Sequence, residues 1–137
     1  MKRALLETVK VSPYTSAAAI DREGFLSGIL GAKVGAPTGS PTALKLKVVF
    51  TECDTESGTY AVVSDKRVVV DKELDASGAI ELETAAAGGD LHNIDLDFVG
   101  CKRFVKATIS VVCTGGTTPS CSATAALALG DKNENPV

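Results

Sequence analysis

Hydrophobic and polar residues alternate with a period of two along much of this chain. The clearest run places Leu44, Leu46, Val48 and Phe50 in one phase, with mostly polar residues between them. Because successive side chains of a β-strand point to opposite faces of a sheet, this pattern predicts a strand with one buried and one wet face. The same alternation recurs later, with apolar phases at Ile80 and Leu82, at Ile94, Leu96 and Phe98, and at Val105, Ala107, Ile109 and Val111.

Shorter apolar runs complete the set of expected strands, and no window shows a sustained helical stripe. These runs cover residues 5–11, 25–34, 59–63, 67–70 and 122–129. Turn-forming segments rich in Gly, Pro, Asp and Ser, such as Ser12-Pro13 and residues 35–42, separate the runs. Runs spaced by about ten residues are typical of antiparallel sandwiches and barrels, so we predict an all-β fold of roughly eight to ten short strands.

The length of 137 residues suits one domain, residues 1–137, with a core of useful size. Residues 1–11 are interpreted as an N-terminal arm or an edge strand, and residues 130–137 as a polar C-terminal tail. The segment 35–42 contains two Pro and two Gly and is expected to protrude as a loop. It is too short to divide the chain into two domains.

The last predicted strand, residues 123–129, reads Ala-Thr-Ala-Ala-Leu-Ala-Leu and is apolar on both faces. A strand of this kind is either central in its sheet or lies at a contact between subunits. The core is also built from small side chains, since aromatic residues make up only 4% of the chain. Oligomerisation is a common way for such a domain to gain stability, and it is a hypothesis for this one.

Composition changes this picture mainly by exclusion. Hydrophobic residues at 45% and charged residues at 23% are ordinary for a globular protein and not for a disordered one. A net charge of -3 argues against a nucleic-acid partner, which selects for a basic surface. The apolar stretch Ala4-Leu5-Leu6 ends at Glu7, short of the ~7 residues that a signal peptide requires, and no run is long enough for a membrane span. We therefore expect synthesis in the cytoplasm and no membrane partner.

The candidate catalytic and metal-binding residues each have a simpler interpretation. His92 is the only histidine and would need a nucleophile and an orienting carboxylate; we expect an ordinary polar residue near a strand start. Residues 54–58 resemble a calcium loop but lack its closing Glu, which favours a hairpin turn. Asp95 and Asp97 share a strand face and are interpreted as solvated charges.

The remaining signals for chemistry are equally weak. The basic cluster Lys102, Arg103 and Lys106 is expected to be balanced by Asp95 and Asp97. The chain contains no phosphate-binding glycine loop before a helix and no nucleophile-elbow motif. We therefore expect no enzyme activity, no cofactor and no metal.

The four cysteines, Cys53, Cys101, Cys113 and Cys121, permit three disulfide pairings and include no C-x-x-C motif. Cys113 and Cys121 flank a loop between two strand-like runs, so a disulfide across this hairpin is geometrically feasible. The alternative, which we favour, is four reduced thiols, as expected in a cytosolic product.

Three motifs between residues 44 and 137 carry a family resemblance. They are the turn Thr-Glu-Cys-Asp-Thr-Glu-Ser-Gly-Thr-Tyr over residues 51–60, the strand Phe-Val-Gly-Cys-Lys-Arg-Phe-Val-Lys over residues 98–106, and the ending Leu-Gly-Asp-Lys-Asn-Glu-Asn-Pro-Val. This layout resembles small virion structural proteins of tailed bacteriophages, in which an E-S-D-D-G-T-x-F turn, a Y-x-G-x-K-R-Y-V-R-V strand and an L-G-x-P-x-x-x-P-V ending recur. The chain departs from that pattern at Cys101, Phe104 and Lys106, and it lacks the first Pro of the ending.

The resemblance implies a jelly-roll-like β-sandwich with no enzyme activity, attached to a capsid. The leading hypothesis is a decoration (cement) protein that binds the major capsid protein at the head surface and associates with itself as a homotrimer. A second hypothesis is a tail-tube, neck or head-fibre subunit. A third, from a different class, is a carbohydrate-binding sandwich. The scarcity of aromatic residues weakens this third hypothesis, because sugar sites present exposed rings for stacking.

Overall fold

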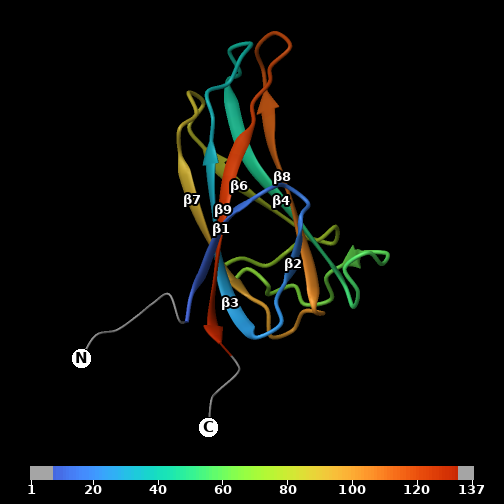
Figure 1. Ribbon diagram of the computed structural model, residues 1–137. Helices are drawn as coiled ribbons and strands as arrows, with labels where there is room; N and C mark the ends of the chain where they lie inside the picture. Colours follow the sequence, from blue (N-terminus) through green and yellow to red (C-terminus); the bar gives the residue numbers. More distant parts are fainter. Residues whose placement is uncertain (1–7, 133–137) are drawn as a thin grey trace, which may run out of the picture.

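The computed structural model describes residues 8–132, whose strands form two antiparallel sheets that face each other (Figure 1). Sheet A has the strand order β1-β9-β3-β7, and sheet B has the order β2-β8-β4, with β5 and β6 following one another along the far edge of β4. The predicted all-β sandwich is confirmed. The strands are β1 (Lys10–Tyr14), β2 (Ala19–Asp21), β3 (Phe25–Val34), β4 (Ala43–Cys53), β5 (Ala61–Val62), β6 (Ala79–Thr84), β7 (Leu91–Asp97), β8 (Phe104–Thr114) and β9 (Ala123–Lys132).

The core lies between the sheets and is built from the apolar phases that the sequence predicts. On β4, Leu44, Leu46, Val48 and Phe50 are fully buried, while the residues between them are partly exposed. Strand β8 pairs with β4 over the whole length of both strands. Strand β4 is flanked by β8 on one edge and by β5 and β6 on the other, whereas β2 covers only the first three residues on the second edge of β8.

Strand β9 is central in sheet A, because β1 pairs with one of its edges and β3 with the other. Leu127 and Leu129 point inward and are buried, whereas Thr124 and Ala126 are exposed on the outer side. The central position was one of the two alternatives for this apolar strand. The other alternative, a contact between subunits, concerns only its outward residues.

Several predicted boundaries are wrong. Residues 67–70 form no strand; Val68 and Val69 are buried, and Val69 makes only an isolated bridge to Leu96, so their hydrophobicity serves core contact in a loop. The short strand β2 was not predicted. Ser12 and Pro13 were assigned to a turn but lie within β1, where proline fits because β1 is an edge strand.

The chain ends also differ from the expectation in part. Residues 5–7 of the first apolar run lie outside the described residues, and β1 starts at Lys10. At the other end, β9 continues to Lys132, into the segment that was assigned to the polar tail, and residues 133–137 lie outside the described part.

The side chain of Tyr14 links the two sheets. It lies on the core side of β1 in sheet A, and its hydroxyl accepts a hydrogen bond from the buried Ala107 N–H of β8 at 3.0 Å and donates to the Ala18 carbonyl at 2.6 Å. Ser16 and Ala17, in the β1–β2 connection, bond the backbone of Ile109 and Ala107. These hydrogen bonds satisfy backbone groups of Ala107 and Ile109 at the edge of β8, beyond the point where β2 ends.

Candidate interaction surface

His92 has no catalytic neighbours in the described residues. It lies on β7, opposite the buried Ala32 of β3, and its Nε2 atom is buried without a hydrogen-bond partner. The nearby carboxylate of Asp90 instead accepts hydrogen bonds from the Thr84 hydroxyl and the Ala85 N–H at 3.1 and 2.8 Å. The arrangement therefore provides no base-activated nucleophile.

The other acidic candidates are placed in a turn and on a sheet surface. Residues 54–58 connect β4 to β5 as the hairpin turn that the sequence predicted, closed by the hydrogen bond from Gly58 N–H to Thr55 O at 3.3 Å. Asp95 is exposed on the outer side of β7, and Asp97 accepts a hydrogen bond from Val99 N–H at 3.0 Å. Across residues 8–132, no three His, Cys, Asp or Glu side chains converge in a way that could hold a metal ion.

The basic cluster is neutralised by its surroundings, but not by the partners that were expected. The structure shows no ion pair from this cluster to Asp95 or Asp97 among the described residues. The partners are Asp54 for Lys102 at 3.8 Å, Asp21 and Glu23 for Arg103 at 2.9 and 2.7 Å, and the ring of Tyr60 for Lys106 at 4.0 Å. The Arg103 guanidinium also lowers the pKa of Asp21. These contacts offset part of the positive charge of the cluster.

All four cysteines are free thiols in the structure. Cys113 and Cys121 border the core, and burial together with the neighbouring Cys113 raises the pKa of Cys121. Burial raises the pKa of Cys101 to about 12. The pKa of Cys53 is lowered, mainly by a hydrogen bond from the Thr55 backbone. Cys53 is therefore more inclined to ionise than Cys101 or Cys121.

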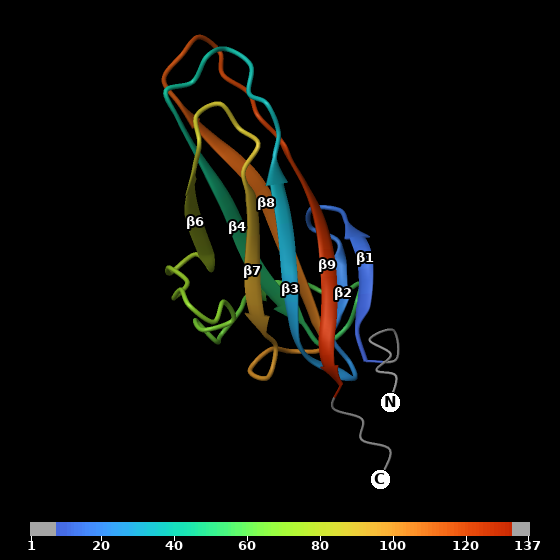
Figure 2. The same ribbon diagram turned by 90° about the vertical axis from the view of Figure 1, so that its left-hand side faces the viewer.

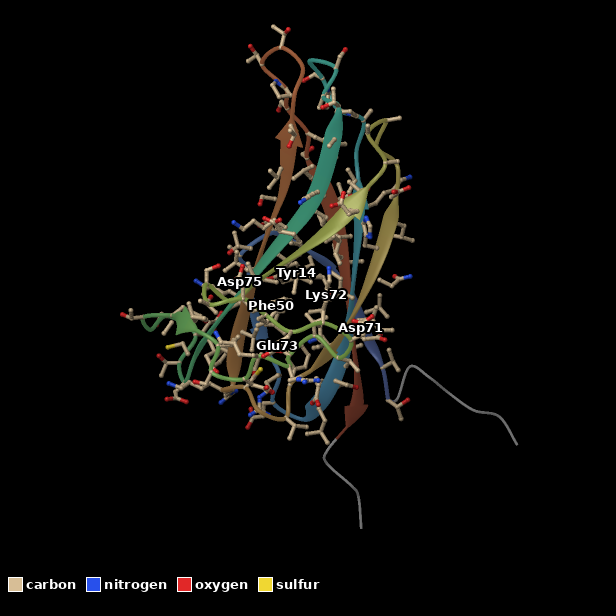
Figure 3. All side chains as sticks on the ribbon, turned by 180° about the vertical axis from the view of Figure 1, so that it is seen from behind. Tyr14, Phe50, Asp71, Lys72, Glu73 and Asp75 are labelled. Atoms are coloured by element: carbon tan, nitrogen blue, oxygen red, sulfur yellow. The ribbon has the colours of Figure 1, made fainter. Side chains whose placement is uncertain are left out.

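The long segment between β5 and β6 is a structural feature that the sequence did not reveal. Figure 3 shows Asp71, Lys72, Glu73 and Asp75 along this segment. Lys72 donates from Nζ to the Glu81 carbonyl of β6 at 2.8 Å, beside a pocket of about 180 Å³ between β6 and β7. Asp75 closes the turn into β6 by accepting from Ser77 N–H and Ala79 N–H. These contacts hold the segment against the open side of the sandwich.

Loops at one end of the sandwich form a braced tip. The β3–β4 loop (35–42) and the β8–β9 loop (115–122) project together beyond the sheets, as Figure 1 shows. Thr38 and Ser120 exchange two backbone hydrogen bonds at 2.8 and 3.1 Å, and Thr117 N–H donates to Gly39 O at 2.9 Å. Neither loop contains a charged residue. The tip is therefore a fixed, uncharged projection.

The outer face of sheet B is mainly polar, with Val62 and Val112 exposed by 41% and 38%, and part of its charge is paired. Lys45 of β4 forms ion pairs with Glu81 and Glu83 of the adjacent β6 at 3.8 and 3.5 Å. Lys47 and Ser110 are cross-strand neighbours on the same face. A face of this composition is well suited to contact with water.

The outer face of sheet A has the opposite character, and Figure 2 looks onto it, with β7, β3, β9 and β1 side by side in front. Four of its large apolar side chains are exposed: Val11 by 70%, Leu91 by 62%, Val70 by 57% and Ile29 by 44%. A depression of about 350 Å³ in the face is lined by residues that include Ile29, Val70 and Ala128. We call this surface the sheet A face; it comprises Val9, Val11, Pro13, Ile29, Gly31, Lys33, Val70, Leu91, Asn93, Asp95, Thr124, Ala126 and Ala128.

No protein-family model, curated protein or solved structure matches this chain. Residues 8–132 contain no helix that is long and apolar enough to cross a bilayer. The features of this chain that bear on its function are the sheet A face and the braced tip.

Proposed function

We propose that this protein is a non-enzymatic structural component of a tailed-bacteriophage virion, which binds the outer surface of the head as a decoration protein. The observation that carries the proposal is the difference between the two outer faces of the sandwich. Of its large apolar side chains, sheet B exposes only Val62 and Val112, by 41% and 38%, beside the ion pairs of Lys45, whereas sheet A exposes Ile29, Val11, Leu91 and Val70 by 44–70%. Contiguous exposed apolar surface on a globular domain typically marks an interaction site.

The strand order adds support for the jelly-roll-like fold that the resemblance implies. Consecutive strands alternate between the sheets from β1 to β4 and again from β6 to β9. Two four-stranded sheets connected in this way are typical of the eight-stranded jelly rolls of capsid proteins, and β5 is a two-residue addition to the edge of β4.

The braced tip is the proposed contact with the major capsid protein. Its two loops are cross-linked by backbone hydrogen bonds, so little conformational entropy would be lost when it binds. Because many copies would bind one lattice, weak contacts of this kind would be multiplied by valency.

The carbohydrate-binding alternative finds little support in the aromatic residues. Phe50 and Phe98 are fully buried, Tyr14 lies in the core, and the ring of Tyr60 is covered by Lys106. Stacking on sugar rings requires exposed aromatic faces. A glycan array with no binding would remove this alternative.

The proposal is tested by locating the protein in purified virions by cryo-electron microscopy, with immunogold labelling as an independent readout. We expect density of a β-sandwich on the outer surface of the head. Density confined to the tail or neck would replace decoration with the second hypothesis. Absence of the protein from purified virions by mass spectrometry would overturn both.

A further inference from the structure

We propose that the sheet A face binds a second copy of this chain in a two-fold, face-to-face arrangement. This inference goes beyond the proposed function, because it concerns the isolated protein and can be tested without a virion. Its basis is the pattern of size, hydrophobicity and charge across the four strands of sheet A.

The middle row of the face consists of small side chains. Cross-strand pairing places Pro13, Ala126, Gly31 and Asn93 side by side from β1 to β7. Gly31 has no side chain and Ala126 only a methyl group, so a second sheet can approach closely at this row. Packed sheets lie about 10 Å apart, a spacing that small residues in the contact permit.

The face also carries two opposite charges at equal distances from this row. On β3, Lys33 lies two residues after Gly31 and Ile29 lies two residues before Gly31. Asp95 of β7 is the cross-strand partner of Ile29, so it lies on the opposite side of the middle row from Lys33. Within one molecule, Lys33 and Asp95 are separated by four residues along the strands, or about 13 Å. Among the described ion pairs, neither residue takes part in one.

A two-fold axis that runs along the middle row, in the plane of the contact and perpendicular to the strands, makes the face complementary to itself. Such an axis lays β3 of one copy over the reversed β3 of the other, so Lys33 stands over the second copy's Ile29 and beside its Asp95. The symmetry forms this ion pair twice. Self-complementary patches of this kind are what isologous dimers require.

The size of the face sets the expected strength of association. Four strands spaced by about 4.8 Å and a length of six residues give a planar patch of roughly 20 by 20 Å. Stable complexes bury about 800 Å² of accessible surface per partner, so this patch, of about 400 Å², is about half that size and falls in the range of weak, transient complexes. We therefore expect a dimer in the micromolar range that exchanges with monomer.

The experiment is sedimentation velocity of the purified full chain between about 5 and 500 µM. Wild-type protein is expected to move from monomer to dimer over this range. Ile29→Lys should weaken the association at least tenfold, because Ile29 lies opposite the second copy's Lys33 in this arrangement and the substitution sets two like charges against each other. The matched control is Val112→Lys, at a residue exposed by 38% on the outer face of sheet B, close to the 44% of Ile29; it should leave association unchanged.

A charge exchange tests the two-fold geometry itself. Lys33→Glu and Asp95→Lys alone should each weaken the dimer, and the double variant should restore it to near the wild-type dissociation constant. Because these residues are too far apart to pair within one copy, restoration reports a contact between copies. Thermal melting of each variant checks that it is folded.

Four results would overturn the proposal. They are a wild-type monomer at every concentration, equal effects of Ile29→Lys and Val112→Lys, no restoration in the double variant, and a limiting mass of three copies. The last result would favour the homotrimer of the leading hypothesis. None of them bears on whether the protein is found on the head, so failure here and failure of the proposed function can be told apart.

Discussion

Replacing Tyr14 by phenylalanine removes one oxygen atom from the contact that joins the two sheets. The hydroxyl accepts from the N–H of Ala107, which is fully buried, and donates to the Ala18 carbonyl. In Tyr14→Phe the ring still fills its place, but the Ala107 N–H is left without its partner. A buried donor without a partner costs about 1–3 kcal/mol, so we expect a loss of about 2 kcal/mol in the free energy of unfolding.

This loss converts into a shift of the melting temperature. Unfolding entropy near 2.1 cal/mol/K per residue gives about 0.3 kcal/mol/K for 137 residues, so Tm should fall by about 7 °C. Urea unfolding followed by far-UV circular dichroism measures the free energy directly. The matched control is Tyr60→Phe, whose exposed hydroxyl donates to Glu56 O; it should change stability by less than about 0.5 kcal/mol.

The same contact predicts an alkaline dependence of stability. Burial raises the pKa of Tyr14 above its ordinary value of 10.0. The folded state therefore holds this proton more tightly than the unfolded state. The stabilisation that the neutral hydroxyl contributes is fully present below pH 10 and is lost as pH rises through the pKa of the folded state. Tyr14→Phe should lack this component. Wild-type and variant proteins with equal stability at pH 7 would refute the role assigned to the hydroxyl.

Three further predictions concern thiols, acid stability and the braced tip. Iodoacetamide should modify Cys53, whose pKa is lowered, well before Cys101, whose pKa burial raises to about 12; peptide mass mapping that finds equal rates would contradict this. Asp21→Asn should lower the free energy of unfolding by about 0.5 kcal/mol at pH 7, because the Arg103 guanidinium lowers the pKa of Asp21. That stabilisation is present above pH 3.8 and disappears as pH falls through the pKa of the folded state, so the free energies of unfolding of wild type and variant in urea should converge near pH 2. Gly116→Ala and Gly24→Ala both place a side chain at positive φ, which costs about 1–2 kcal/mol. Only at Gly116 would the new Cβ collide with the facing loop, so the melting temperature of Gly116→Ala should fall clearly further than that of Gly24→Ala.

The sequence predicts best those elements whose side chains face a uniform environment along their length. Strand β4 alternates without interruption and is buried on one side throughout, so its pattern alone located its core residues. Residues 67–70 are apolar for a different reason, because Val68 and Val69 reach the core from a loop. Strand β2 has only three residues, too few for a period to be recognised.

The candidate surface could not be predicted in the same way, because it depends on strand order. Alternation indicates that Ile29 and Ala128 point outward, but nothing in the sequence indicates that they are cross-strand neighbours. The same limitation explains the wrong partners for the basic cluster. Asp95 and Asp97 are near it along the chain, whereas Asp21 is brought beside Arg103 by the pairing of β2 with β8.

The two outer faces finally bear on why this protein would associate at all. Exposed apolar surface forgoes about 25 cal/mol for every Å² that could have been buried, and this chain has few aromatic residues with which to compensate in its core. On sheet B the available charges are used in pairs between neighbouring strands, as with Lys45 and Glu83. On sheet A the charges of Lys33 and Asp95 are placed where no strand of the same molecule can pair them. A neighbouring molecule can both cover the apolar surface and complete these pairs, which is why the sheet A face is the part of this surface where we expect assembly to begin.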